Sequence, residues 1–246
     1  MTDTDGADCG CLTPTGPVRA FAVPGVAPVA GDWVVLSGTE LVMVLPRETV
    51  VRRGCGPDDV RGEVLAANVD QVLVVQAYSA ELTPERTERL LALATAGSAR
   101  PVLVLSQIDR AGDGAAVRSV LADLAVLAES CPGTPVLGLS TDPGYLGLHR
   151  LRTLVAGSVT AVFGPPGCGK STLTDALSGT TPRRNTGATL VPIPGGGALI
   201  DTPGCDPDVP DWLAERYVSR LRAAQRARWR AGSPAGRRLH PLAGGA

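Results

Sequence analysis

The chain has 246 residues, of which 44% are hydrophobic, 19% charged and 3% aromatic, and its formal net charge is −1. This length favours two modules or one domain with an appendage, and the composition excludes a largely disordered chain. No apolar run approaches the roughly 20 residues that span a bilayer, and the acidic start lacks the pattern of a signal peptide. We therefore expect a cytoplasmic protein with no membrane or DNA partner.

The sequence pattern of the first part of the chain changes near residue 17. Residues 1–16 show no periodicity and are expected to be a flexible N-terminus. Short β-rich runs follow at 19–22, 32–36, 41–45 and 49–52, separated by Gly and Pro, which predicts a small β-barrel or sandwich over residues 17–61. Because little ordered sequence precedes Arg19, we expect this barrel to be shortened by one strand.

Residues 62–210 alternate between continuous apolar runs and amphipathic stretches. The runs predict buried strands and the stretches predict helices: strands at 69–75, 101–105, 135–139, 159–163 and 198–200, and helices at 84–96, 115–129, 146–155 and 170–177. This alternation predicts an α/β fold, a parallel sheet with helices on both faces, whose ligands lie at the carboxyl ends of the strands.

The segment from Gly164 to Thr172 carries the most specific motif. It matches G-x-x-x-x-G-K-[ST] between a predicted strand and a predicted helix: Gly164, Pro165, Pro166, Gly167, Cys168, Gly169, Lys170, Ser171 and Thr172. Backbone N–H groups of such a loop surround phosphate oxygens, Lys170 reaches the outer phosphates, and Ser171 offers a hydroxyl to Mg²⁺. Lys170 is the only lysine among 23 basic residues, at a position that requires a compact ammonium. The alternative is an ordinary glycine turn.

Two further segments fit a nucleotide site. Asp201 ends a predicted buried strand, where it can hold Mg²⁺, and Gly204 can offer its N–H to a γ-phosphate, although Asp-Thr-Pro-Gly alone is an ordinary turn. Ser106, Gln107 and Asp109 follow another strand, where guanine-specific proteins carry Asn-Lys-x-Asp. Asp109 can accept both N–H donors of guanine and disfavours adenine, unless it only caps a helix.

The order of these motifs is reversed relative to ordinary GTPases. The base motif precedes the phosphate loop, and Ser140 and Thr141 lie between them as a candidate further base-contacting loop. This order indicates a circularly permuted P-loop GTPase. With Gly31-Asp-Trp-Val34, Val44-Leu-Pro-Arg47, residues 66–71 and residues 195–204, the sequence resembles the ribosome-assembly GTPase family RsgA, also called YjeQ, over roughly residues 17–206.

The resemblance implies an OB-fold barrel before the permuted domain, GTP or GDP and Mg²⁺ as ligands, and the small ribosomal subunit and its rRNA as partner. By the same match Thr186 is a magnesium-sensing threonine. The chain departs from the family where a histidine implicated in hydrolysis is absent before Thr186, and where Cys205 stands in place of a water-orienting glutamine. Lys170 and, tentatively, Arg184 are the candidate catalytic residues.

The C-terminal part departs most from the family. The family ends in a zinc domain, but this chain has no cysteine after Cys205 and only His240, so no zinc is expected. Residues 211–246 hold eight arginines and two acidic residues, a balance of +6 that leaves −7 for residues 1–210. They predict a basic helix and a mobile tail, either a solvated cover on the sheet or a contact for RNA phosphates.

Three functions fit the sequence. The first is GTP binding with slow Mg²⁺-dependent hydrolysis, related to assembly of the small ribosomal subunit. The second is a nucleotide-gated binding module that has lost efficient hydrolysis. The third is an ATP-dependent P-loop enzyme, which requires that Asp109 does not contact a base.

Overall fold

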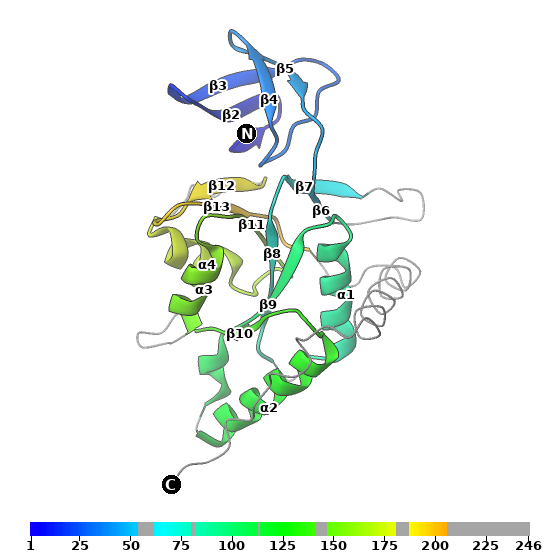
Figure 1. Ribbon diagram of the computed structural model, residues 1–246, viewed down its shortest axis with the longest axis vertical. Coiled ribbons are helices and arrows are strands. Elements are labelled where there is room, and N and C mark those ends of the chain that lie inside the picture. The colour runs from blue at the N-terminus through cyan, green and yellow to red at the C-terminus, as the bar shows by residue number, and fades with distance from the viewer. Residues whose placement is uncertain (54–61, 80–81, 113, 141–146, 181–186, 206–246) are drawn as a thin grey trace.

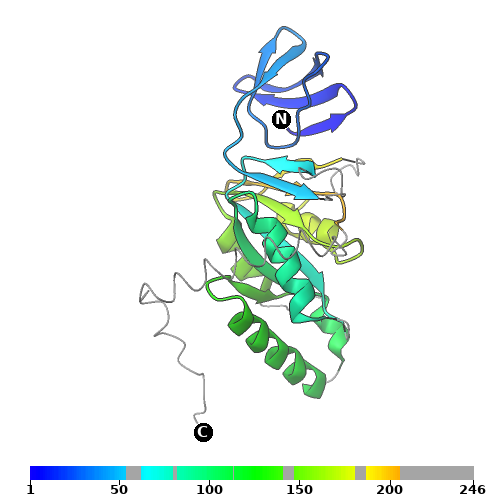
Figure 2. The same ribbon diagram turned by 90° about the vertical axis from the view of Figure 1, so that its right-hand side faces the viewer.

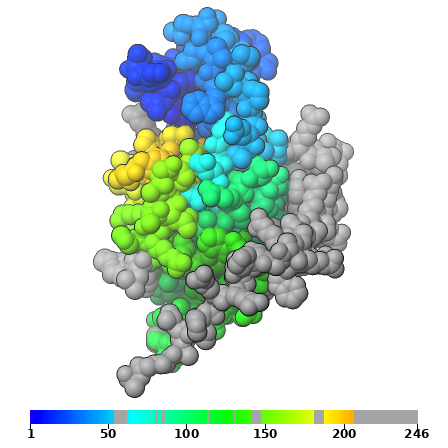
Figure 3. Space-filling view, in the orientation of Figure 1, coloured from blue at the N-terminus to red at the C-terminus, as the bar shows by residue number. Residues whose placement is uncertain are grey.

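The computed structural model describes residues 1–53, 62–79, 82–112, 114–140, 147–180 and 187–205. A small β-barrel lies at one end of a larger α/β domain, and a two-stranded ribbon lies between them (Figure 1). Figure 3 shows the barrel as a narrower lobe on top of this larger domain. Among the described residues, no helix combines the length and apolar character needed to cross a membrane.

The barrel is a five-stranded sheet with the order β1-β2-β3-β5-β4. Its strands are β1 (Asp3–Asp5), β2 (Asp8–Thr13), β3 (Gly16–Ala22), β4 (Val34–Ser37) and β5 (Glu40–Val44). β3 and β5 pair in parallel, whereas the other pairs are antiparallel. Cys9, Cys11, Ala20 and Leu41 form its buried core. A partly open five-stranded barrel of this kind fits the expected OB-like domain.

The expectation of a flexible start at residues 1–16, and with it that of a barrel lacking its first strand, is wrong. This segment forms β1, β2 and the start of β3. The guanidinium of Arg19 in β3 forms ion pairs with Asp3 in β1, at 2.6 Å, and Asp8 in β2, at 2.8 Å. Its hydrogen bond to Asp8 lowers the pKa of that carboxyl. Cys9 and Cys11 are buried side chains of the barrel core, and burial raises the pKa of both thiols.

The ribbon consists of β6 (Val50–Arg53) and β7 (Glu63–Ala67), which pair with each other. Val51 belongs to the core of the larger domain, together with Leu65 of β7 and Leu90 of the first helix. The run at 49–52 therefore packs against the larger domain and is not part of the five-stranded sheet, and the expected boundary at residues 54–61 lies outside the described residues. The ribbon is also bonded to the connection between β3 and β4 of the barrel, because Ala67 N–H donates to Ala30 O.

The larger domain holds a six-stranded sheet with the order β10-β9-β8-β11-β13-β12, in which only β12 is antiparallel to its neighbour. The strands are β8 (Gln71–Ala77), β9 (Arg100–Ser106), β10 (Val136–Gly138), β11 (Val159–Phe163), β12 (Thr189–Pro192) and β13 (Ala198–Asp201). The helices are α1 (Pro84–Thr95), the short 3-10 helix η1 (Ile108–Ala111), α2 (Gly114–Ser130), α3 (Gly147–Val155) and α4 (Lys170–Ser178).

Alternation along the strands explains why helices cover both faces of this sheet. Val72 and Val74 of β8 share a core with Leu90 of α1 and with Leu127 of α2. The intervening Leu73 and Val75 lie in a second core that includes side chains of α3 and α4, among them Leu151 and Leu173. Figure 2 shows the helices stacked against the sheet below the ribbon. The expected α/β fold is confirmed, and the parallel strands direct their carboxyl ends to one edge.

Candidate nucleotide-binding site

The phosphate loop connects the end of β11 to the first turn of α4. Gly167 and Gly169 adopt positive φ angles of 76° and 91°, and a side chain at Gly164 would overlap the carbonyl oxygen of Val75. Lys170 begins α4, and only 7% of its surface is exposed. Its ammonium donates hydrogen bonds to the carbonyl oxygens of Gly164, at 2.9 Å, and Pro165, at 2.8 Å. The loop thus holds its cation close to where phosphates would meet the helix N-terminus.

Cys168 lies in this loop but faces inward. It is buried among the side chains of the core beneath α3 and α4, and burial raises the pKa of its thiol. Its backbone carbonyl, in contrast, accepts a hydrogen bond from the hydroxyl of Ser106 at the end of β9. The side chain of Cys168 therefore has a packing role, and its peptide group contributes to the site.

The segment after β13 lies against the phosphate loop. Asp201 is in register with Val162 of β11, and the Thr202 hydroxyl donates a 2.6 Å hydrogen bond to the Val162 carbonyl. Cys205 N–H donates to Gly164 O at 2.9 Å. A Cβ atom at Gly204 would lie 2.7 Å from Cγ of Pro166, so only glycine permits this approach. Asp201 and Gly204 are therefore next to the loop, as the strand order predicts.

The base motif reaches the same loop from β9. The Ser106 hydroxyl lies within hydrogen-bond distance of the carbonyl oxygens of Cys168, at 2.6 Å, and Gln76, at 3.1 Å, and its one proton favours the shorter contact to Cys168. Gln107 has a positive φ of 59°, and its side-chain amide donates to the carbonyl of Gly167 at 3.1 Å. Both side chains that replace the usual Asn and Lys thus bind the phosphate loop.

Asp109 is exposed in the first turn of η1, whose N-cap position is occupied by Gln107. The alternative that Asp109 caps a helix is therefore wrong for this 3-10 helix. Asp109 lines a cavity of about 190 Å³. The cavity is lined by residues from the base motif, the Ser140 segment and the start of α4: Ser106, Gln107, Asp109, Arg110, Leu139, Ser140, Gly169, Thr172 and Leu173.

This cavity joins groups that are far apart in the sequence. Ser140 is buried in the wall, whereas Arg110, Leu139 and Leu173 are lining residues that the motifs did not indicate. Leu139 ends a continuous apolar run, and Leu173 is an inward position of α4, so each has a sequence signal for burial but none for ligand contact. The two leucines give the cavity apolar walls, and Asp109 gives it a carboxylate. Such a combination suits a flat base with N–H donors.

A magnesium ion requires hard oxygen ligands, and in phosphate sites it takes only one or two from the protein. The Ser171 hydroxyl, in the first turn of α4, and Asp201, whose Oδ1 atom is buried, fit this donor set. Within the described ranges, no group of three or more His, Cys, Asp and Glu residues forms a metal site by itself. Thr141, Arg184 and Thr186, together with the C-terminal residues 206–246, lie outside the described residues.

A base motif that precedes the phosphate loop in the chain, yet meets it in space, defines a circularly permuted P-loop protein. The RsgA GTPase family model matches residues 44–207. A relative from Streptomyces avermitilis, named small ribosomal subunit biogenesis GTPase RsgA, is 34% identical, with 88% of this chain and 64% of the relative covered. The chain belongs to the RsgA GTPase family.

Two solved structures share the fold. The crystal structure of YjeQ from Thermotoga maritima superposes with a TM-score of 0.65 and 23% identity, over 85% of this chain and 76% of that one. YloQ, described as a circularly permuted GTPase, gives a TM-score of 0.61 and 19% identity, over 90% and 77% of the two chains. The chain spans between 50% and 64% of the length of the first curated relatives it matches.

Proposed function

We propose that this chain binds GTP with Mg²⁺, hydrolyses it slowly, and acts in the cytoplasm on the small ribosomal subunit. The observation that carries the nucleotide part is the single cavity where Asp109 and Ser140 meet Gly169 and Thr172 of the phosphate loop. The ribosomal partner rests on the names of the relatives. Contact with rRNA, through the barrel or the basic residues 211–246, belongs to the same proposal.

Several chain groups have assigned roles in this proposal. Lys170 and the loop N–H groups bind the phosphates, Ser171, Thr186 and Asp201 hold the metal, and Gly204 meets the γ-phosphate. The magnesium ion supplies charge neutralisation at the phosphate oxygens when bound. Asp109 accepts the N–H donors of guanine, and Ser140 and Thr141 complete the base site. Arg184 neutralises charge on the departing phosphoryl group, and no zinc is required.

A second candidate is a binding module that is gated by nucleotide but has lost hydrolysis. It is favoured by Cys205, which follows Gly204, is buried and offers no group that could orient a water molecule. One assay separates the two: GTP hydrolysis by the full chain, measured with and without small ribosomal subunits. Stimulation by subunits supports the GTPase, and tight GTP binding without turnover in either condition supports the module. Binding of ATP in preference to GTP would overturn both and support an ATP-dependent enzyme.

A further inference from the structure

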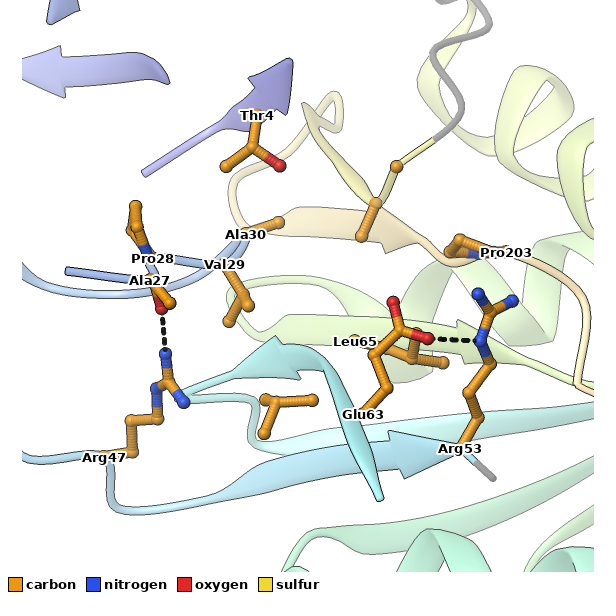
Figure 4. A pocket seen from close by; sticks show the side chains of 13 residues that line it. Thr4, Ala27, Pro28, Val29, Ala30, Arg47, Arg53, Glu63, Leu65 and Pro203 are labelled. Atoms are coloured by element: carbon orange, nitrogen blue, oxygen red, sulfur yellow. Dashed lines mark hydrogen bonds and ion pairs between the residues drawn. The ribbon is translucent and has the colours of Figure 1, made fainter. Parts of the chain in front are cut away.

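Arg53, the last residue of β6, contacts the loop that follows Asp201, although 151 residues separate it from Gly204. Its Nη1 donates a 3.2 Å hydrogen bond to Gly204 O, and its Nε donates a 2.7 Å hydrogen bond to Glu63 of β7. Figure 4 shows the Arg53 and Glu63 side chains joined in this way beside Pro203. The ribbon thus holds a guanidinium against the peptide that follows Gly204.

That peptide is fixed at both ends. Its carbonyl accepts from Arg53, and its N–H, on Cys205, donates to Gly164 O at 2.9 Å. Gly164 O also accepts from the Lys170 ammonium at 2.9 Å. A continuous path of hydrogen bonds therefore runs from Arg53 through the 204–205 peptide and the first carbonyl of the phosphate loop to the phosphate-binding lysine.

The same ribbon is tied to the barrel. Arg47, just before β6, forms a 2.7 Å ion pair with the buried carboxylate of Asp32 and donates to Ala27 O. A cavity of about 410 Å³ lies at this junction (Figure 4). It is lined by the β3–β4 connection of the barrel, the ribbon and both segments that flank the expected γ-phosphate site, among them Ala27, Arg47, Arg53, Glu63, Gly187 and Pro203.

We infer that Arg53 is a positioning residue. By holding the 204–205 peptide, it keeps Gly204 N–H directed toward a third phosphate, and it couples the presence of that phosphate to the barrel junction. The reason is geometric. Gly204 N–H can point to a γ-phosphate only if the flanking peptides hold their orientation, and the 204–205 peptide is held by Arg53 on one side and by Gly164 on the other. A bound phosphate would draw the Lys170 ammonium away from Gly164 O. This carbonyl would keep Cys205 N–H as its hydrogen-bond partner. The altered hydrogen bonding at Gly164 O would therefore act on the 204–205 peptide, which Arg53 binds.

This inference rests on the proposed function, and the two can be tested separately. Fluorescent GDP and a fluorescent non-hydrolysable GTP analogue are titrated with Mg²⁺ against the full chain and against Arg53→Ala. We expect the variant to bind the GTP analogue at least fivefold more weakly and GDP within twofold of the native affinity. The matched control is Arg52→Ala, which removes the neighbouring guanidinium, bonded to Gly62 O at 3.3 Å, and is expected to change neither affinity.

A second readout follows the junction directly. In the native protein, the GTP analogue should slow amide exchange in β6 and β7 relative to GDP, and Arg53→Ala should remove this difference. If Arg53→Ala melts well below the native protein, Arg53→Lys is used, because its single ammonium cannot bridge Glu63 and Gly204 O as the guanidinium does. Equal losses for both nucleotides, or no loss, would overturn the inference. A native chain that binds neither nucleotide would instead overturn the proposed function.

Discussion

The hydroxyl of Ser106 donates a 2.6 Å hydrogen bond to the carbonyl oxygen of Cys168, which joins the base motif to the phosphate loop across 62 residues of sequence. The hydroxyl is buried and also lies 3.1 Å from Gln76 O. Ser106→Ala removes the donor from the buried Cys168 carbonyl. We expect a loss of about 1–2 kcal/mol in unfolding free energy and roughly tenfold in GDP affinity, measured by urea unfolding and nucleotide titration. Ser178→Ala, a helix-end hydroxyl outside the cavity, is the control and should leave GDP affinity unchanged.

Asp109 should decide which base is bound. Its carboxylate can accept from the two adjacent N–H groups of guanine, whereas adenine presents no such pair, so GDP should bind at least about tenfold more tightly than ADP, or 1.4 kcal/mol. Asp109→Ala should remove most of this difference. Asp109→Asn should shift the preference toward xanthosine diphosphate, because an amide can donate to the xanthine carbonyl and accept from its N–H. Equal affinity of the native chain for GDP and ADP would contradict the assignment.

Lys170 should be required for the outer phosphates and dispensable for the fold. Its ammonium contacts only loop carbonyls among the described partners, so its removal should leave the sheet and both cores intact. Because hydrogen bonds to charged groups contribute about 1.5–3 kcal/mol each, Lys170→Ala should weaken GTP binding by at least about tenfold. Lys170→Arg should not restore it, since a planar guanidinium does not fit the loop. Thermal melting serves as the check on folding, and native-like affinity in either variant would show that the loop does not bind phosphate.

Cys131 should make stability fall at high pH. Burial, and secondarily the Glu88 carboxylate, raise the pKa of this thiol from 9.0 to about 11. Between pH 9 and pH 11 the folded chain therefore keeps the thiol proton and the unfolded chain loses it. The contribution of Cys131 to the unfolding free energy is complete below pH 9 and is lost as the pH rises toward 11. The total is about 3 kcal/mol in unfolding free energy. Urea unfolding at pH 8 and pH 10 measures the decline, and a Cys131→Ala variant should decline less over the same interval.

The parts of this molecule that could be predicted from sequence are those that local pattern determines. The phosphate loop and its strand and helix are contiguous in the sequence. The strands β8, β9 and β11 are each a continuous apolar run. Residues 1–16 were missed because β1 and β2 depend on ion pairs with Arg19 and on small cysteine side chains that alternate inward. The contact of Arg53 with Gly204 has no local signal either. It joins segments 151 residues apart, and no sequence motif links the two residues.

Turnover of the isolated protein should be slow. Ser171, Asp201 and Thr186 are expected to provide oxygens for the metal, so triphosphate should bind. Binding alone does not orient water for in-line attack. Cys205 is buried and bonded through its N–H to Gly164, and it offers no such group. We therefore expect fewer than roughly one GTP hydrolysed per minute, far below ordinary enzyme rates. Arg184 could neutralise charge on the departing phosphoryl group once a partner holds it in place. Phosphate release should accordingly rise on small ribosomal subunits and rise less for Arg184→Ala than for the native chain. Rapid turnover without any partner would mean that another residue of this chain positions the water.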